Sequence, residues 1–228
     1  MAKRKKRTYD YDFVDDEITY LNREIAKQFS ALKAMTALDE INIKTEVGKA
    51  YRSLAVLIRK VLLLVARFYY DEAWEQERRY RNWLDEQWIE DILTAYDPVS
   101  KYVFANEEDR KRARLVEALI ASKTPAKELD AASKSLALMF RVYVVRVADE
   151  AVLRSMRDQD TVYVQWIAEL DERTCEICSA RDLRIYPIED LPDKPHINCR
   201  CTYRTVKKDY AKIEYTPAGD RGRDTEDR

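Results

Sequence analysis

The sequence predicts an α+β protein: mainly long α-helices, followed by a small C-terminal β element stapled by a cluster of cysteines and histidine. Apolar residues recur at three- and four-residue steps through the first two thirds of the chain, which is the spacing of one helical face. The only glycines are Gly48, Gly219 and Gly222, so few positions between them adopt positive φ at low energy, which favours long helices. All four cysteines and the only histidine lie between Cys175 and Cys201.

Length and charge limit the classes of function. With 228 residues the chain can form one large or two small domains, and we expect two. Its 41 Lys and Arg residues nearly balance 42 Asp and Glu, so any contact with nucleic acid must be local. The basic start has no apolar segment after it, so we expect no secretory signal and synthesis in a reducing cytoplasm. The most apolar run contains Arg59 and Lys60 and falls short of the roughly 20 residues of a membrane span, so we expect no membrane partner.

The N-terminal region predicts a basic arm and then a helix. We expect residues 1–15 to be a mobile arm, because the first seven residues carry five cations and no apolar anchor: Lys3, Arg4, Lys5, Lys6 and Arg7. A helical body should follow over residues 16–123. Its first helix should run from about Asp16 to Leu38, with one apolar face formed by Ile18, Leu21, Ile25, Phe29, Leu32 and Met35.

The next region, from about Lys44 to Ala95, contains no proline and continues the helical spacing of apolar residues. It predicts one very long helix, or two with a kink. Its second half contains oppositely charged residues four apart, Glu75 with Arg79 and Glu77 with Arg81, which support an exposed helical face. The helix should end before Pro98, because proline removes a backbone donor.

Two more helices should follow. Asn106 is the expected N-cap of the first, with three acidic residues in the first turn, and this helix should end near Ser122. The second should start at Pro125, capped by Thr124, and continue to about Arg157. The β-branched run in its middle, "VYVVRV", has strand propensity and opposes that prediction.

After this helix the periodicity changes from helical to alternating. Residues from Val162 to Leu170 alternate in polarity and predict a half-buried strand, and "RIYPI" and "CTYRTV" predict two further short strands. Residues 209–228 form a polar tail, and we expect its part from Pro217 to Arg228 to be disordered.

The cysteines and the histidine have the spacing of a structural zinc site. Cys-x2-Cys directs two thiolates at one point from a tight turn, and a distant second group completes a tetrahedron. Five candidates compete for four places. We favour Cys175, Cys178 and His196 together with one of Cys199 or Cys201, since those two would point to opposite faces of an extended strand.

Three alternatives remain open for this cluster. Disulfides would require an oxidising compartment, which nothing in the sequence indicates. The thiols can instead pack as small apolar groups without metal. A catalytic zinc would require a general base and a substrate pocket that the sequence does not identify. Asp171 and Glu172, which lie close by, are expected to cap the turn before Cys175.

An ordered set of rare residues carries a family resemblance. Between Trp166 and Val206 an aspartate and a threonine precede Cys-x2-Cys, a hydrophobic hairpin ending in proline follows, and the segment closes with His-x-Asn-Cys-Arg-Cys. This pattern resembles the phage head morphogenesis proteins related to the F protein of phage Mu. The matching residues are Asp171, Thr174, Cys175, Cys178, Asp182, Tyr186, Pro187, His196, Asn198, Cys199, Arg200 and Cys201.

The resemblance covers about Lys127 to Val206, within a domain placed at residues 124–208 whose Cys/His module spans 171–206. This chain departs from the family pattern at two places. The family typically has glycine after Asp182, where Leu183 stands here, and a helical Arg-Thr-Glu where this chain has residues 146–149.

The resemblance implies a minor structural and assembly protein of a tailed-phage head, associated with the portal vertex during procapsid assembly. It implies the portal protein and other head proteins as partners, DNA contact in some members, assembly in the host cytoplasm and a final location in the virion. No catalytic residues come with that role, so we expect neither an enzyme nor a small-molecule substrate.

The alternative is a zinc-stabilised nucleic-acid-binding module. In that case the N-terminal arm and a second basic stripe would contact phosphates, the stripe being Arg110, Lys111, Arg112 and Arg114. The acidic residues that precede this stripe offset its charge, which also fits a solvated helical face.

Overall fold

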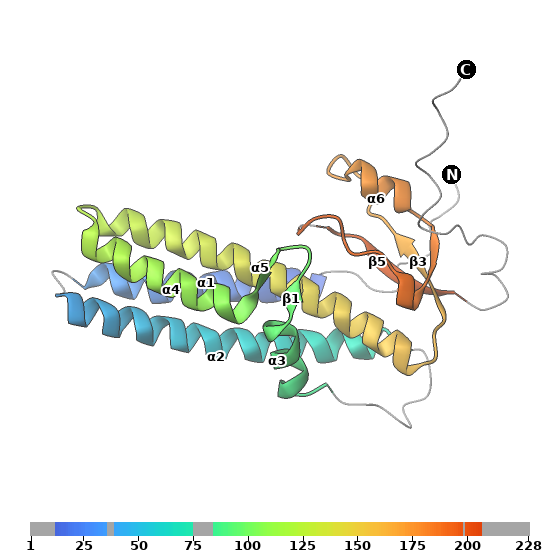
Figure 1. The fold of residues 1–228 in the computed structure, drawn as a ribbon, viewed down its shortest axis with the longest axis horizontal. Helices are drawn as coiled ribbons and strands as arrows, with labels where there is room; N and C mark the ends of the chain where they lie inside the picture. The colour runs from blue at the N-terminus through green and yellow to red at the C-terminus, as the bar shows by residue number, and fades with distance from the viewer. Residues whose placement is uncertain (1–11, 36–38, 75–83, 198, 207–228) are drawn as a thin grey trace, which may run out of the picture. The chain divides into compact units, whose positions relative to one another are not determined.

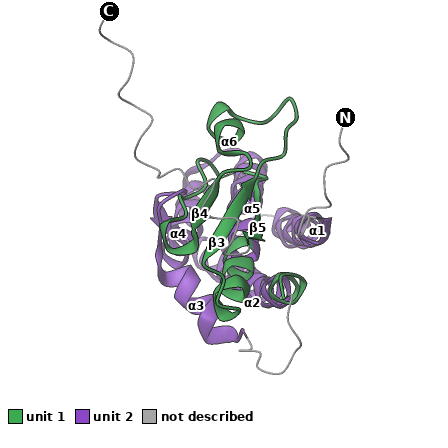
Figure 2. Cartoon of the chain, turned by 90° about the vertical axis from the view of Figure 1, so that its right-hand side faces the viewer, with its two compact units in different colours: residues 1–11, 68–82, 149–228 green, residues 12–67, 83–148 purple. Residues whose placement is uncertain are grey.

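The structure is a computed structural model that describes residues 12–35, 39–74, 84–197 and 199–206. It is α+β, with helices first and a small sheet near the C-terminal end, as predicted (Figure 1). The chain forms two compact units (Figure 2). The helical unit comprises residues 12–67 and 83–148, and the Cys/His unit comprises residues 68–82 and 149–228 together with 1–11. The division falls inside two helices and does not coincide with residues 123 and 124.

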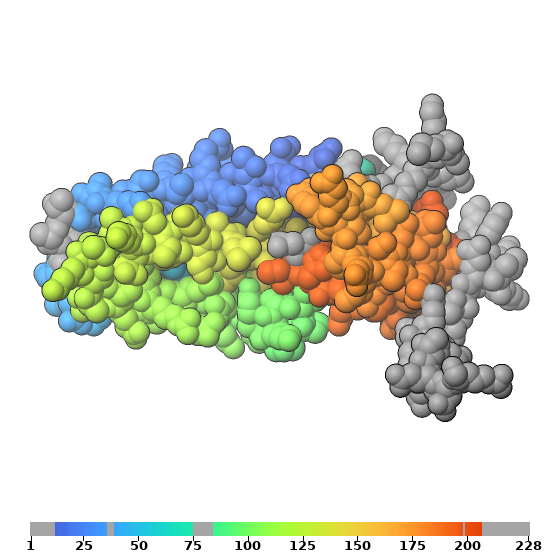
Figure 3. Space-filling view, turned by 90° about the horizontal axis from the view of Figure 1, so that it is seen from above, coloured from blue at the N-terminus to red at the C-terminus, as the bar shows by residue number. Residues whose placement is uncertain are grey.

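Helix α1, Asp12–Ala34, confirms the first predicted helix, although it starts and ends about one turn earlier. The predicted apolar face is buried at Ile18, Leu21, Ile25, Phe29 and Leu32, whereas Met35 follows the helix and is exposed. Helix α1 lies alongside the N-terminal part of helix α5 (Pro125–Asp158) in the space-filling view (Figure 3), and Lys33 pairs there with Asp130.

The predicted helical region from Lys44 to Ala95 forms two separate helices, α2 (Glu40–Glu72) and α3 (Glu86–Thr94). Asp85 starts α3 by accepting a hydrogen bond from the Trp88 backbone N at 3.0 Å. Helix α3 ends before Pro98 as expected, and a short hairpin of β1 (Tyr96–Asp97) and β2 (Tyr102–Val103) follows. The two predicted Glu–Arg pairs of residues 75–81 lie outside the described residues.

Helix α4, Phe104–Ala121, shows that the predicted N-cap at Asn106 is wrong. The helix starts two residues earlier, at Phe104, with Val103 in the N-cap position. Phe104 is fully buried, with its ring centroid 4.4 Å from that of Tyr143 and 6.0 Å from that of Phe140. Burying such a side chain stabilises by about 1.5–3 kcal/mol, whereas a cap contributes about 1 kcal/mol, so packing determines where this helix begins.

Helix α5 begins at Pro125 as predicted and continues without interruption through the β-branched run. Val142, Val144 and Val147 in that run are all buried. Burial on several sides of a long helix therefore outweighs the modest strand propensity of these residues. Within the Cys/His unit, the last turn of α5 contacts the end of α2, where the Tyr70 hydroxyl donates to Asp158 Oδ2 at 2.8 Å.

The described residues of the Cys/His unit form an antiparallel sheet in the order β4–β3–β5. All three predicted strands are present: β3 (Tyr163–Ile167), β4 (Ile185–Pro187) and β5 (Thr202–Val206). Strand β3 is shorter than predicted, because the Ala168 backbone N donates to Asp182 Oδ1 at 2.8 Å. Trp166 is fully buried, and its ring lies edge-on to Tyr203 with centroids 5.5 Å apart.

The connection from β3 to β4 contains a short helix, α6 (Glu176–Arg181), which the sequence pattern did not predict. After it, Leu183 adopts φ 63°, and it is half exposed. This is the left-handed region that favours glycine. No helix within the described ranges is long and apolar enough to cross a membrane.

Candidate metal centre

The first two cysteines are positioned by the start of helix α6. Cys175 is its N-cap, with an extended backbone, and its Sγ accepts a hydrogen bond from the Cys178 backbone N at 3.4 Å. Cys178 lies in the first turn and is buried. A cap and a first-turn residue lie on the same side of a helix start, so both sulfurs face one point. This is the arrangement that Cys-x2-Cys predicts.

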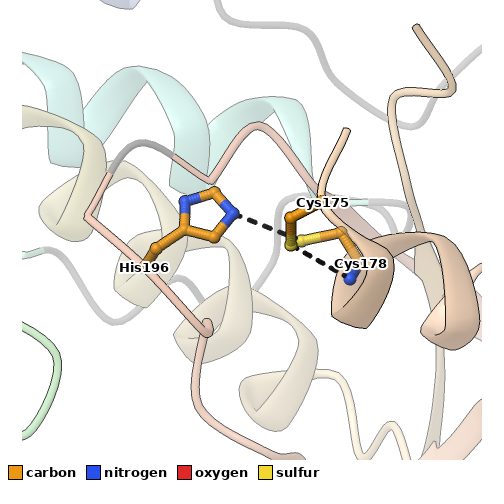
Figure 4. A group of neighbouring side chains, drawn as sticks. All are labelled: Cys175, Cys178 and His196. Atoms are coloured by element: carbon orange, nitrogen blue, oxygen red, sulfur yellow. Dashed lines mark hydrogen bonds between the residues drawn. The ribbon is translucent and has the colours of Figure 1, made fainter. Parts of the chain in front are cut away.

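The remaining donors come from the irregular segment that precedes β5. His196 Nε2 lies 3.6 Å from Cys178 Sγ (Figure 4), and Cys199 Sγ lies 3.5 Å from the same sulfur. The Cys199 backbone N donates to the His196 carbonyl at 3.1 Å, which forms a tight turn between these two residues. The histidine and the second cysteine pair therefore return to the sulfurs of α6.

All five predicted donors belong to two groups that share Cys178. One group is Cys175, Cys178 and His196, and the other is Cys178, Cys199 and Cys201; within each, the donor atoms lie within 4.8 Å of one another. Cys199 and Cys201 thus reach the same sulfur, although we expected only one of them to do so. The expectation assumed an extended strand, but β5 begins at Thr202, after both cysteines. The alternation of side chains along a strand therefore does not apply to these two cysteines, and even in a strand side chains two residues apart share a face, so both can point to Cys178.

The spacing of these atoms suits a single metal ion. Two sulfurs bound to one zinc ion at about 2.3 Å and at the tetrahedral angle lie about 3.8 Å apart, close to the distance from Cys178 to Cys199. A cavity of about 10 Å³ opens among Cys175, Cys178, His196 and Cys201. This volume is the space of one small sphere the size of water. The cluster can therefore hold a metal ion.

The four cysteines carry free thiols in the structure, and the surroundings of three of them shift their pKa values in different directions. Burial raises the pKa of Cys178 to about 12. A hydrogen bond from the Cys201 thiol lowers the pKa of Cys199 to about 6, and the same bond raises the pKa of Cys201. Cys199 is therefore the most readily deprotonated of these three thiols, and a metal ion that binds Cys178 or Cys201 would displace the proton of that thiol.

The turn before Cys175 is closed as the sequence predicts. Asp171 Oδ1 accepts from the Arg173 backbone N at 2.9 Å, and the Asp171 backbone N donates to Thr174 Oγ1 at 3.0 Å. Glu172, the other expected cap, is exposed. Arg200 donates to both oxygens of Asp171, and this fork holds the pKa of Asp171 well below its usual range.

Sequence reasoning did not identify Lys194 and Asp149 as part of this region. Lys194 Nζ lies 2.5 Å from Asp149 Oδ2, and both side chains are about nine-tenths buried. Lys194 precedes His196 by two residues, but Asp149 belongs to α5. Only the tertiary fold brings them together, so no local sequence signal announces the pair.

The two groups of basic residues considered as phosphate contacts have different outcomes. The arm residues Lys3, Arg4, Lys5, Lys6 and Arg7 lie outside the described residues. On α4, Arg110 and Lys111 pair with the buried Glu107, and Arg112 pairs with Asp109, whereas Arg114 is exposed. Three of these four cations thus have an acidic partner on their own helix.

Comparison with known proteins finds no relative of this chain. No family model matches it, and no curated protein or solved structure is significantly similar to it.

Proposed function

We propose that the cluster binds one zinc ion as a structural staple. The donor set of thiols and an imidazole is the set that zinc prefers, and four of the five donors are enough for its tetrahedral coordination. The buried sulfurs of Cys178, Cys199 and Cys201 fit a closed structural site better than a catalytic site with an open position.

In this proposal the zinc ion stabilises the fold of the Cys/His unit. The Cys/His unit has strands of only three to five residues, and so small a sheet buries little apolar surface. A zinc ion would join helix α6 to the segment that leads into β5. Its binding free energy would then contribute directly to folding of this unit.

We further propose that the chain is a minor structural and assembly protein of a tailed-phage head, associated with the portal vertex. The observation that carries this proposal is that the family-like residues contact one another around one centre. Asp171 and Thr174 close the turn that presents Cys175, and Arg200 bonds to Asp171 from between the last two cysteines. Leu183 supports the resemblance too, since its positive φ lies where the family has glycine.

In this proposal the helical unit contacts portal or other head proteins, and the Cys/His unit is held rigid by zinc. The protein would assemble in the host cytoplasm, remain in the virion and catalyse no reaction. The alternative, a nucleic-acid-binding module, has less support because most of the α4 cations are already paired with acids.

Co-expression with the portal protein of the same genome tests the proposal. We expect the chain to co-purify with the portal ring at a fixed ratio, and to lose this association when zinc is removed. A parallel filter-binding assay with duplex DNA over a salt series tests the alternative, since phosphate contacts weaken steeply with salt. Salt-dependent DNA binding without any association with the portal ring would contradict the assembly role.

A further inference from the structure

Three of the five metal donors lie on a segment with no regular structure. Residues 191–197 and 199–201 belong to no helix or strand, yet they carry His196, Cys199 and Cys201. A helix or strand fixes its side chains through a ladder of backbone hydrogen bonds, and this segment has no such ladder. Something else must hold its donors at the positions that the metal requires.

One end of the segment is fixed to helix α5 by the pair of Lys194 and Asp149. The two charged atoms lie 2.5 Å apart, and the side chains are 11% and 10% exposed. Lys194 Nζ also lies 5.7 Å from the centre of the Tyr203 ring, on strand β5. The lysine therefore anchors the backbone two residues before His196.

The other end is fixed to the turn before α6 by the fork between Arg200 and Asp171. The Arg200 Nη1 and Nη2 atoms donate to the two Asp171 oxygens at 2.7 and 2.6 Å. Arg200 stands between Cys199 and Cys201, and Asp171 stands in the turn that presents Cys175. The fork thus joins the two halves of the donor set directly.

We propose that these two ion pairs are positioning pairs, which hold the donor segment in place for the metal and slow the metal's release. The inference rests on the proposed metal site and deepens it, because it assigns to four charged residues the task of orienting the ligands. Residues that orient metal ligands typically change affinity by about 10- to 100-fold when they are lost.

The fork offers the sharper test, because its side chains are about one third exposed and their loss leaves no buried charge. Arg200→Lys keeps the charge but removes the planar two-bond geometry, and Asp171→Asn keeps the shape but removes the charge. The matched control is Arg157→Lys, which alters an ion pair with Glu189 in the same unit, seven residues before His196. The full-length protein loaded with zinc is mixed with a chromophoric chelator, and the release rate is measured.

We expect Arg200→Lys and Asp171→Asn each to release zinc about tenfold faster, or more, than the wild type. The double variant should release zinc no faster than the more severe single variant, since either substitution alone already removes the interaction between Arg200 and Asp171. The control should match the wild type. Wild-type release rates in both fork variants, or equal acceleration by the control, would overturn the inference.

Lys194→Met tests the buried end with a second readout. At saturating zinc we expect this variant to keep its far-ultraviolet circular dichroism and yet to release zinc faster than the wild type. A folded Lys194→Met variant with unchanged release would overturn the role of this pair. If the wild type itself binds no zinc, the proposed metal site fails, which is a different result from a wild type that binds zinc with no effect of the pairs.

Discussion

Cys178 is the donor whose loss should weaken metal binding most. It is the donor that belongs to both groups, so Cys178→Ser leaves Cys175 with His196 and Cys199 with Cys201 but removes the one sulfur that lies within 4.8 Å of all of them. Cys175→Ser instead leaves the shared sulfur together with three other donors, which still make a complete set of four. The two substitutions remove the same atom type from the start of one short helix, Cys175 from its N-cap and Cys178 from its first turn, so each serves as the control for the other.

The magnitude follows from the strength of structural zinc sites. Such sites bind with about 10–16 kcal/mol, so an even share for each of four ligands is about 2.5–4 kcal/mol, or roughly 70- to 1,000-fold in affinity. We expect at least this loss for Cys178→Ser. For Cys175→Ser we expect about tenfold or less, because a spare donor takes the empty place.

Competition with a chelator of known affinity, near neutral pH, measures both changes. Far-ultraviolet circular dichroism and thermal melting, recorded beside it, report whether the Cys/His unit unfolds while the helical unit stays folded. Equal losses for the two variants, or a larger loss for Cys175→Ser, would refute the claim that Cys178 is the shared ligand.

Three further predictions concern the turn, the helix start and pH. Leu183→Gly should stabilise the Cys/His unit by about 0.5–1 kcal/mol, measured by denaturant unfolding. The substitution removes about 1–2 kcal/mol of strain from the left-handed backbone, and the extra freedom of glycine in the unfolded chain costs about 0.5–1 kcal/mol. Leu183→Ala, which keeps the Cβ, should give no such gain. Phe104→Ala should destabilise the helical unit by about 3–5 kcal/mol in thermal unfolding, whereas Asn106→Ala should cost less than about 0.5 kcal/mol; a large effect of Asn106→Ala would restore it as the cap. Zinc affinity, measured by competition over a pH series, should fall as pH falls, because burial raises the pKa of Cys178 to about 12 and protons compete for that sulfur; a flat profile would contradict thiolate ligation.

Local periodicity predicted most of the helices and strands because each buries a regular face. The apolar face of α1 is an example, and it survives in the buried residues of the structure. In β3, Val164 and Trp166 are buried as the alternation predicts, but Gln165 between them is buried as well. The start of α4 could not be predicted in this way. Phe104 determines it through contacts with Phe140 and Tyr143, which lie on another helix and leave no trace near residue 104.

The candidate site shows the same division between local and tertiary information. Rare residues at characteristic spacing were enough to identify all five donors, because cysteine and histidine occur nowhere else in the chain. The roles of Cys199 and Cys201 depended on where β5 begins, and the sequence left that boundary uncertain by one or two residues. The pairing of Lys194 with Asp149 depended on the packing of a loop against α5.

Metal analysis of freshly purified protein, combined with a count of free thiols in the same sample, tests the central claim most directly. Our account predicts one zinc ion per chain, with at least three of the four thiols reacting freely only after a chelator has removed the metal. Two outcomes would contradict it: a metal-free protein with four reactive thiols that melts at the same temperature with and without added zinc, or a metal-free protein with disulfides.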